Sequence, residues 1–262
     1  MRILTVIKQV PDSNASIKIG GDGRSIETTG LKLVLNPFDE FAIEQAVQLR
    51  EKGLPVEEIV ALTIGAEKSS EILRTALAMG ADRGIHLNDD AFVSHDELYL
   101  AEVLSLAIKQ QPQPFDLILI GKQAIDMDAG EIGPALAEFL GLPHVGAIVG
   151  LEAEADKITA RRRIEGAEEV MECPLPVLLT CEKGLVEARY PSLPNLMKAK
   201  KKPVETIGSG DLQGFGELGG PRSDVLSLTP PAARGACRIV EGEPAEMAKE
   251  LVRLLREEAK VI

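Results

Sequence analysis

Two carboxylates lie in a short polar loop between an apolar run and a helical pattern. The apolar run, residues 117–120, has the length and composition of a buried strand. The loop, residues 122–128, contains Asp126 and Asp128, and residues 129–140 then show helical spacing of apolar side chains. A strand, a polar turn and a helix N-terminus present backbone N–H groups to an anion at the ligand-binding edge of an α/β sheet. We therefore expect a nucleotide pocket at this loop.

The two loop acids have alternative uses in metal binding and acid–base chemistry, but acids before a helix more often cap it or bind ribose. The three histidines, at positions 86, 95 and 144, do not pair at metal-ligand spacing. Cys173, Cys181 and Cys237 are odd in number and lack close pairing, so buried thiols in a reducing compartment are expected. No GxSxG or HExxH motif occurs, and no GxGxxG follows the first strand, so a dinucleotide fold of the Rossmann type is poorly supported. The residues alone indicate nucleotide binding without a visible catalytic set.

The composition limits the class of partner. The chain has 262 residues, of which 45% are hydrophobic, and a net charge of −12. The negative charge and the lack of Trp argue against a nucleic-acid partner. No apolar run approaches the roughly 20 residues that span a bilayer, and the apolar start is too short for a signal peptide. We expect a cytoplasmic protein with no direct membrane insertion.

Strand and helix patterns alternate from residue 2 to residue 143. Strands are expected at 2–7, 58–64, 84–87 and 117–120, and helices at 36–53, 70–79, 96–110 and 129–140. Pro37 is at the first helical position of the first helix pattern, and Asn36 before it is a typical N-cap. This alternation predicts an α/β fold, a mostly parallel, doubly wound sheet flanked by helices.

The pattern changes after residue 143. An antiparallel addition is expected from strands at 145–151, 157–164 and 169–172, with a further strand at 176–180, and an earlier glycine-turn hairpin joins 16–19 to 25–28. Residues 198–202 are a basic run that reads as a solvated helix end. From residue 207 the chain is rich in Gly, Pro and Ser, and 244–255 forms an amphipathic helix. We divide the chain into an α/β domain, 1–206, and an extended C-terminal arm, 207–262.

Five segments in order along the chain resemble the beta subunit of electron transfer flavoprotein. They are VIKQVPD at 6–12, NPF at 36–38, RTALAMGADR at 74–83, GKQAID at 121–126 and YPSLPNLMKAKKK at 190–202. The resemblance implies an adenine-nucleotide-hydrolase-like fold. It also implies a heterodimer in which the C-terminal arm packs on an alpha subunit.

The resemblance implies an electron carrier subunit and not an enzyme. In this family the alpha subunit mainly holds the redox FAD, and the beta subunit binds AMP structurally. Electrons pass from acyl-CoA and related dehydrogenases, as in fatty acid oxidation, to a membrane quinone oxidoreductase.

The family pattern places the AMP contacts at the ends of three strands and the starts of two helices. These residues are Val6, Asn36, Pro37, Phe38, Asp39, Ile64, Gly121, Lys122, Gln123, Ala124, Ile125, Asp126, Met127, Asp128, Ala129, Gly130, Glu131 and Ile132. By this pattern, backbone groups at the strand ends would form hydrogen bonds to adenine. Asp126 or Asp128 would reach ribose, and the amides of 130–132 would hold phosphate.

One departure from the family pattern leaves a different nucleotide, FAD, possible in this site. Gly133-Pro134 resembles electron-bifurcating relatives, whose beta subunit carries a second FAD in place of AMP and reacts with NADH. Those relatives typically have Gly at position 127 and Thr at 129, where this chain has Met127 and Ala129. A diphosphate passing the loop would prefer a small residue at 127, which favours AMP.

Residues 190–202 resemble the family's recognition loop for partner dehydrogenases. The expected partner-binding residues are Leu193, Pro194, Met197 and Lys198. Leu193 is the anchor by motif, and the lysines would steer acidic partner surfaces by charge. The alternative is that Leu193 and Leu196 pack beneath a local turn.

Overall fold

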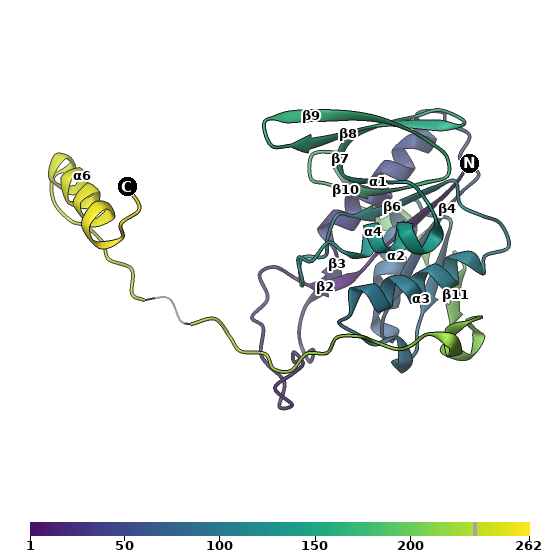
Figure 1. Ribbon diagram of the computed structural model, residues 1–262, viewed down its shortest axis with the longest axis horizontal. Helices are drawn as coiled ribbons and strands as arrows, with labels where there is room; N and C mark the ends of the chain where they lie inside the picture. Colours follow the sequence, from purple (N-terminus) through teal and green to yellow (C-terminus); the bar gives the residue numbers. More distant parts are fainter. Residues whose placement is uncertain (233–234) are drawn as a thin grey trace. The chain divides into compact units, whose positions relative to one another are not determined.

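A computed structural model describes residues 1–232 and 235–262 of the chain (Figure 1). They form two compact units, Met1–Ser227 and Leu228–Ile262. The strands are β1 (Arg2–Val6), β2 (Gln9–Pro11), β3 (Leu33–Leu35), β4 (Glu58–Ile64), β5 (Arg83–Leu87), β6 (Leu117–Gly121), β7 (His144–Ala153), β8 (Lys157–Ile164), β9 (Ala167–Pro174), β10 (Val177–Cys181) and β11 (Val204–Ile207). The α-helices are α1 (Pro37–Glu51), α2 (Ser70–Met79), α3 (Glu97–Lys109), α4 (Ile132–Leu140), α5 (Leu193–Ala199) and α6 (Pro244–Arg253). Single 3₁₀ turns lie at Glu67–Ser69, Asp90–Phe92, Ser209–Asp211 and Phe215–Glu217.

The first unit is built on a nine-stranded sheet with the order β11-β5-β4-β1-β6-β10-β7-β8-β9. The strands from β11 to β7 are parallel, and β8 and β9 extend the sheet as antiparallel strands (Figure 1). The chain leaves β1 toward β4 and β5 and then returns to β6 on the other side of β1. The strand order therefore reverses between β1 and β6, where ligands bind in doubly wound sheets. The predicted fold class is confirmed.

Alternate side chains of the parallel strands feed two hydrophobic cores. Ile3 and Leu119 point into one core with α1 and α2, while Leu4 and Ile118 point into the other with α3 and α4. All four side chains are buried. A strand apolar on both faces needs helices on both sides, which explains the continuous apolar runs seen in the sequence.

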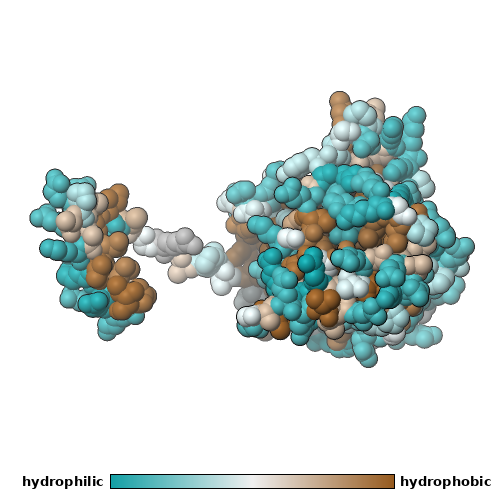
Figure 2. Space-filling view, turned by 90° about the horizontal axis from the view of Figure 1, so that it is seen from above, coloured by the Kyte–Doolittle hydropathy of each residue, from teal (hydrophilic) through white to brown (hydrophobic). Residues whose placement is uncertain are grey.

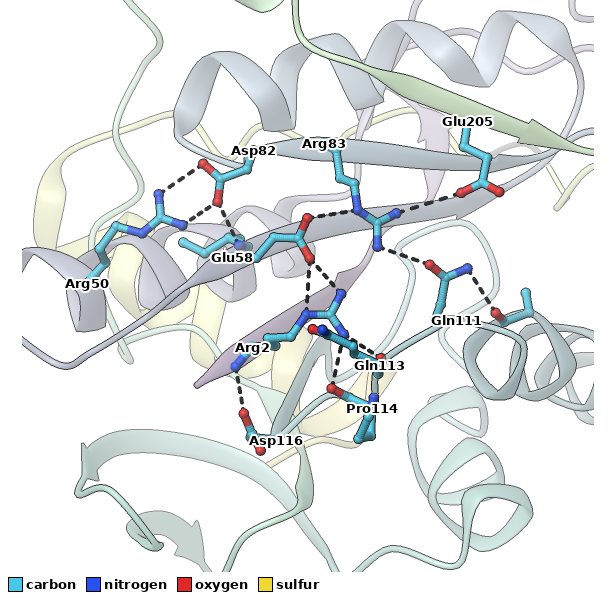
Figure 3. A network of polar contacts seen from close by, with 12 residues as sticks. Arg2, Arg50, Glu58, Asp82, Arg83, Gln111, Gln113, Pro114, Asp116 and Glu205 are labelled. Carbon is cyan, nitrogen blue, oxygen red and sulfur yellow. Dashed lines mark hydrogen bonds and ion pairs between the residues drawn. The ribbon is translucent and has the colours of Figure 1, made fainter.

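Ion pairs join the N-terminal ends of three neighbouring strands, β1, β4 and β5 (Figure 3). Arg2 at the start of β1 donates to Glu58 on β4 at 2.6 Å, and Arg83 on β5 donates to the same carboxylate at 2.9 Å. The pKa of Glu58 is lowered by these two guanidinium groups, although partial burial opposes the shift. The Glu58 carboxylate thus fixes the relative positions of these three strands at their N-terminal ends.

Two of the expected elements differ clearly from the structure. The predicted hairpin at 16–19 and 25–28 is reduced to a single bridge between Ile19 and Ile26. Helix α4 begins at Ile132 and not at residue 129, because Asp128 and Gly130 have positive φ angles of 54° and 69° that no helix accommodates.

Residues 207–227 belong to the first compact unit, whereas the sequence placed the boundary at 206. The Asp96 carboxylate accepts hydrogen bonds from the amides of Arg222 and Ser223 at 2.7 and 2.9 Å. Leu212 is buried, and the Phe215 ring packs edge-on against Phe92 at 5.1 Å. These contacts hold the glycine-rich segment on the α/β core.

The second unit contains α6, which continues as a π-helical turn over Leu254–Glu258. Met247, Leu251 and Val252 on α6 leave 36%, 50% and 44% of their surface exposed. Figure 2 shows hydrophobic residues, in brown, along one side of this unit and hydrophilic residues, in teal, along the other. The predicted amphipathic helix is confirmed. Among the described residues, no helix combines the length and apolar character needed to cross a bilayer.

Candidate functional site

A cavity of about 310 Å³ opens at the carboxyl ends of β1, β4 and β6. This volume lies at the lower end of the range of small-molecule pockets, roughly 300–1,000 Å³. Its walls are mostly apolar, with a few polar groups at the rim. The lining residues are Val6, Ile7, Lys8, Gln9, Asn36, Asp39, Ile64, Gly65, Ala66, Ser69, Phe92, Val93, Ser94, Glu97, Leu100, Leu104, Ile120, Gly121, Lys122, Gln123, Ala124, Gly130, Ile132 and Gly133.

The cavity brings together ten of the eighteen residues expected to bind a nucleotide. They are Val6, Asn36, Asp39, Ile64, Gly121, Lys122, Gln123, Ala124, Gly130 and Ile132. The other eight lie beside the cavity in the same two segments without lining it. They are Pro37, Phe38, Ile125, Asp126, Met127, Asp128, Ala129 and Glu131.

Asp39 fixes the floor of the cavity. Its two carboxylate oxygens accept hydrogen bonds from the Lys8 amide at 2.7 Å and from the Gly121 amide at 2.9 Å. These amides follow β1 and end β6, so one side chain of α1 holds the two strand ends together. Burial raises the pKa of Asp39 to about 7, although the amide donors and Lys8 favour its charged form.

Asn36 does not cap α1 with its side chain, contrary to the prediction from sequence. Its Nδ2 donates to the Gln123 carbonyl at 2.9 Å, and its Oδ1 accepts from the Ile125 amide at 3.3 Å. This buried side chain therefore makes both of these hydrogen bonds to the loop after β6. It ties that loop to the start of α1 across the mouth of the cavity.

The two loop carboxylates bond to protein groups. Asp126 pairs with Lys8 Nζ at 2.8 Å, and Asp128 accepts from the Gln123 side chain at 2.7 Å. Neither aspartate lines the cavity. Both therefore hold the loop in shape, and the side chains nearest the cavity in this loop are Lys122, Gln123 and Ala124.

Several loop amides remain available for a ligand. The N–H groups of Gln123, Ala124, Ala129 and Gly130 have no acceptor in the part of the chain that the structure describes. The first N–H groups of a helix also lack intrahelical partners, which adds those of α4. Unpaired amides around a cavity suit an anion such as phosphate.

The residues that form one wall of the cavity were not predicted from the sequence. Phe92, Val93, Ser94, Glu97, Leu100 and Leu104 come from the turn after β5 and from α3. The sequence placed the two leucines only within the helix expected at 96–110. Their place in the cavity follows from the packing of α3 beside α4, which no local pattern encodes.

Residues beside predicted positions were also missed. They are Ile7, Lys8, Gln9, Gly65, Ala66, Ser69, Ile120 and Gly133. Most follow strand ends that were expected to bind ligand, so extending each strand end by two or three residues would have included them.

The two lysines of the lining, Lys8 and Lys122, are already paired with carboxylates of the protein. Lys122 forms an ion pair with Glu182 and lies 5.6 Å from the centre of the Phe38 ring. Across the residues that the structure describes, no three His, Cys, Asp or Glu side chains cluster as metal ligands do. Cys181 is buried and its pKa is raised by burial, whereas Cys237 is exposed, contrary to the expectation of buried thiols throughout.

The expected partner-binding residues form one turn of exposed helix. Leu193, Pro194, Met197 and Lys198 all lie on α5, with Leu193 73% and Met197 57% exposed. Ser192 caps the helix by accepting from the Asn195 amide at 3.4 Å. Leu193 is thus held outward at the start of a capped helix and is not packed beneath a turn.

The chain is similar in sequence to proteins of one known family. The family model described as "Electron transfer flavoprotein domain" matches residues 24–212. The chain is 41% identical to the electron transfer flavoprotein subunit beta of Bacillus subtilis (strain 168), with 100% of both chains covered. It is 39% identical to the proteins of the same name from Sus scrofa and Homo sapiens, covering 100% of this chain and 99% of each relative.

Proposed function

The chain belongs to the family of electron transfer flavoprotein beta subunits, and we propose that it binds AMP in the cavity between β1 and β6 as structural support. In this proposal the chain pairs with an alpha subunit that mainly holds the redox FAD. The observation that carries the proposal is a largely apolar cavity bordered by unpaired loop amides at the reversal of strand order.

The residues present fit an adenylate. Val6, Ile64 and Ile120 at three strand ends offer an apolar surface to a purine, while nearby backbone groups can read its edge. The unpaired amides of 129–130 and the first amides of α4 can hold one phosphate. Bound AMP would bridge the loop after β6 to the ends of β1 and β4. It supplies no redox chemistry there.

The second candidate, FAD in this cavity with an NADH site, was suggested by Gly133-Pro134. Gly133 has a separate explanation in the fold, because a Cβ there would overlap the Thr180 methyl group on β10. The close approach of α4 to the sheet therefore requires glycine whatever nucleotide binds. Met127 is 42% exposed and lies outside the lining, so it neither supports nor blocks a flavin.

The proposed cellular role is electron transport. FAD in the complex would accept electrons from acyl-CoA and related dehydrogenases, as in fatty acid oxidation, and pass them to a membrane quinone oxidoreductase. This chain would orient the dehydrogenase through α5 and grip the alpha subunit with the unit Leu228–Ile262, whose helix exposes an apolar stripe. The complex would act in the cytoplasm.

Counting the nucleotides released from the purified complex tests the proposal. We expect one FAD and one AMP per heterodimer after denaturation and chromatography. Two FAD and no AMP would establish the bifurcating alternative, and a complex with no adenine nucleotide besides the alpha-subunit FAD would overturn both. Substituting Asn36 by leucine should lower the AMP count and leave the FAD count unchanged, because this side chain holds the loop after β6 beside the cavity.

A further inference from the structure

Glu97 is a buried carboxylate in the wall of the cavity. It is the first residue of α3, only 8% of its surface is exposed, and it lies among the lining residues. Its Oε2 accepts a hydrogen bond from the Glu131 amide at 3.0 Å. Glu131 is the residue that precedes α4, so the carboxylate sits at the positive end of that helix.

No cation in the part of the chain that the structure describes balances this carboxylate. Within residues 1–232 and 235–262, Glu97 forms no ion pair with Lys, Arg or His. The two lysines of the lining, Lys8 and Lys122, are paired with Asp126 and Glu182. A buried carboxylate without a counter-ion is costly, and the positive N-terminal ends of two helices compensate it: α3, in whose first turn Glu97 lies, and α4.

The start of α4 has few donors to share. Pro134, the third residue of the helix, has no N–H group, and the Ala135 amide already bonds to the Glu131 carbonyl at 3.1 Å. Glu97 occupies the Glu131 amide. In the part of the chain that the structure describes, the amides of Gly130, Ile132 and Gly133 are left at the start of α4, about the number that one phosphate group engages. The unpaired amides of Gln123, Ala124 and Ala129 lie earlier in the loop.

We propose that Glu97 is a specificity-determining residue that restricts the cavity to adenine nucleotides with a single phosphate. This inference rests on the proposed function, because it concerns the same cavity. The carboxylate holds one donor of the anion site and adds a negative charge beside it. A second phosphate group would meet this charge with neither a free lysine nor a further helix amide to offset it.

Charge repulsion is large enough to produce selectivity. Two unit charges about 5–10 Å apart, in a site with an effective dielectric constant near 20, repel strongly enough that one further phosphate charge should cost at least about tenfold in binding. The same repulsion would act against the diphosphate of a dinucleotide such as FAD.

The test uses the heterodimer freed of its endogenous AMP and titrated by calorimetry with adenosine, AMP and ADP. We expect the wild-type complex to bind AMP at least about tenfold more tightly than ADP. Glu97→Gln keeps the shape and an acceptor oxygen but removes the charge, so it should reduce this preference about tenfold. Glu97→Asp keeps the charge and should keep most of the preference.

The matched control is Glu138→Gln. Glu138 is an exposed carboxylate on the same helix α4, away from its N-terminus, and its substitution changes net charge equally. It should leave the ratio of AMP to ADP affinity within about twofold of the wild-type value, because charges exposed to solvent are screened.

Three results separate failure of this inference from failure of the proposed function. Equal wild-type affinity for AMP and ADP overturns the role of Glu97 while leaving adenylate binding intact. An unchanged preference in Glu97→Gln does the same, and so does a preference lost equally in Glu138→Gln. If none of the three ligands binds the wild-type complex, the proposed function itself fails.

Discussion

The Asp39 carboxylate and the Gly121 backbone are joined by a hydrogen bond of 2.9 Å across 82 residues of sequence. The same carboxylate also binds the Lys8 amide. The ends of β1 and β6 are therefore positioned by one side chain from α1, and the candidate nucleotide site is built around that contact.

Gly121→Ala should destabilise the protein and distort the cavity. A Cβ at this position would lie 2.6 Å from Phe38 Cβ and would also overlap the Asp39 carboxylate. Overpacking of this kind typically costs about 1–3 kcal/mol. We expect a lower thermal midpoint and a reduced AMP count per complex. Gly21→Ala is the control, since a Cβ at Gly21 meets open space, and an equal effect of both variants would contradict this account of Gly121.

Asp39 should make stability depend on pH in a defined window. Its pKa is raised by burial from 3.8 to about 7, so between these values the unfolded chain loses a proton that the folded chain retains. The contribution of Asp39 to stability is therefore complete below about pH 4 and declines as the pH rises toward about 7. Thermal unfolding of the full chain across this range, for the wild type and Asp39→Asn, measures the effect.

Asp39→Asn should remove that part of the pH dependence. It should also lower stability by about 1–3 kcal/mol, because its NH₂ group would face one of the two amide donors and leave that amide unpaired. Asp128→Asn, at an exposed position of the loop after β6, should retain the wild-type pH dependence. Retention of the full slope in Asp39→Asn would show that another group causes it.

The sequence predicted the central fold because apolar periodicity is a local property. The strands 117–120 and 58–64 were correctly identified from apolar runs, and the helices after them from spacing. Antiparallel β7, β8 and β9 were also recognised, but their continuation of the parallel sheet through β10 was not. That pairing depends on contacts between distant segments, which no single window of sequence contains.

The candidate site was predicted less completely for a related reason. Asn36 has the sequence context of a helix cap, yet its side chain bonds to a loop 87 residues later. Asp126 or Asp128 was expected to reach ribose; in the structure Asp126 forms an ion pair with Lys8, which follows β1. Glu97 was seen only as part of a helix. Side-chain roles of this kind are decided by tertiary partners and not by residue type.

Lys202 and Lys201 should respond differently to substitution although they are neighbours in the basic run. Lys202 Nζ donates to the Leu77 and Ala81 carbonyls at the end of α2, and burial lowers its pKa, contrary to the expected solvated position. Lys202→Met should lower stability by about 1–3 kcal/mol, because two carbonyls lose a charged donor. Lys201→Met, at an exposed residue, should leave the thermal midpoint unchanged.

Variants of Lys201 and Lys202 also distinguish an effect on electrostatic steering of the partner from an effect on stability. Lys201→Met should slow electron uptake from an acidic dehydrogenase at low salt, and the difference from wild type should shrink as ionic strength rises. Stopped-flow reduction of the complex at several salt concentrations measures it. A rate that is independent of both the substitution and the salt would remove the exposed lysines from partner recognition.

Leu193→Ala should leave the heterodimer folded but slow its reduction by the dehydrogenase. Leu193 is 73% exposed at the start of α5, so its truncation removes little buried surface and should change the thermal midpoint hardly at all. An exposed apolar anchor that fills a partner's pocket typically contributes about 2 kcal/mol or more to binding, which corresponds to at least roughly tenfold in the apparent affinity for the dehydrogenase. Leu226→Ala is the matched control, because Leu226 is 79% exposed in the same unit and lies outside α5. Steady-state assays with increasing dehydrogenase should show the loss only in Leu193→Ala, and equal rates for the two variants would mean that α5 is not the docking surface.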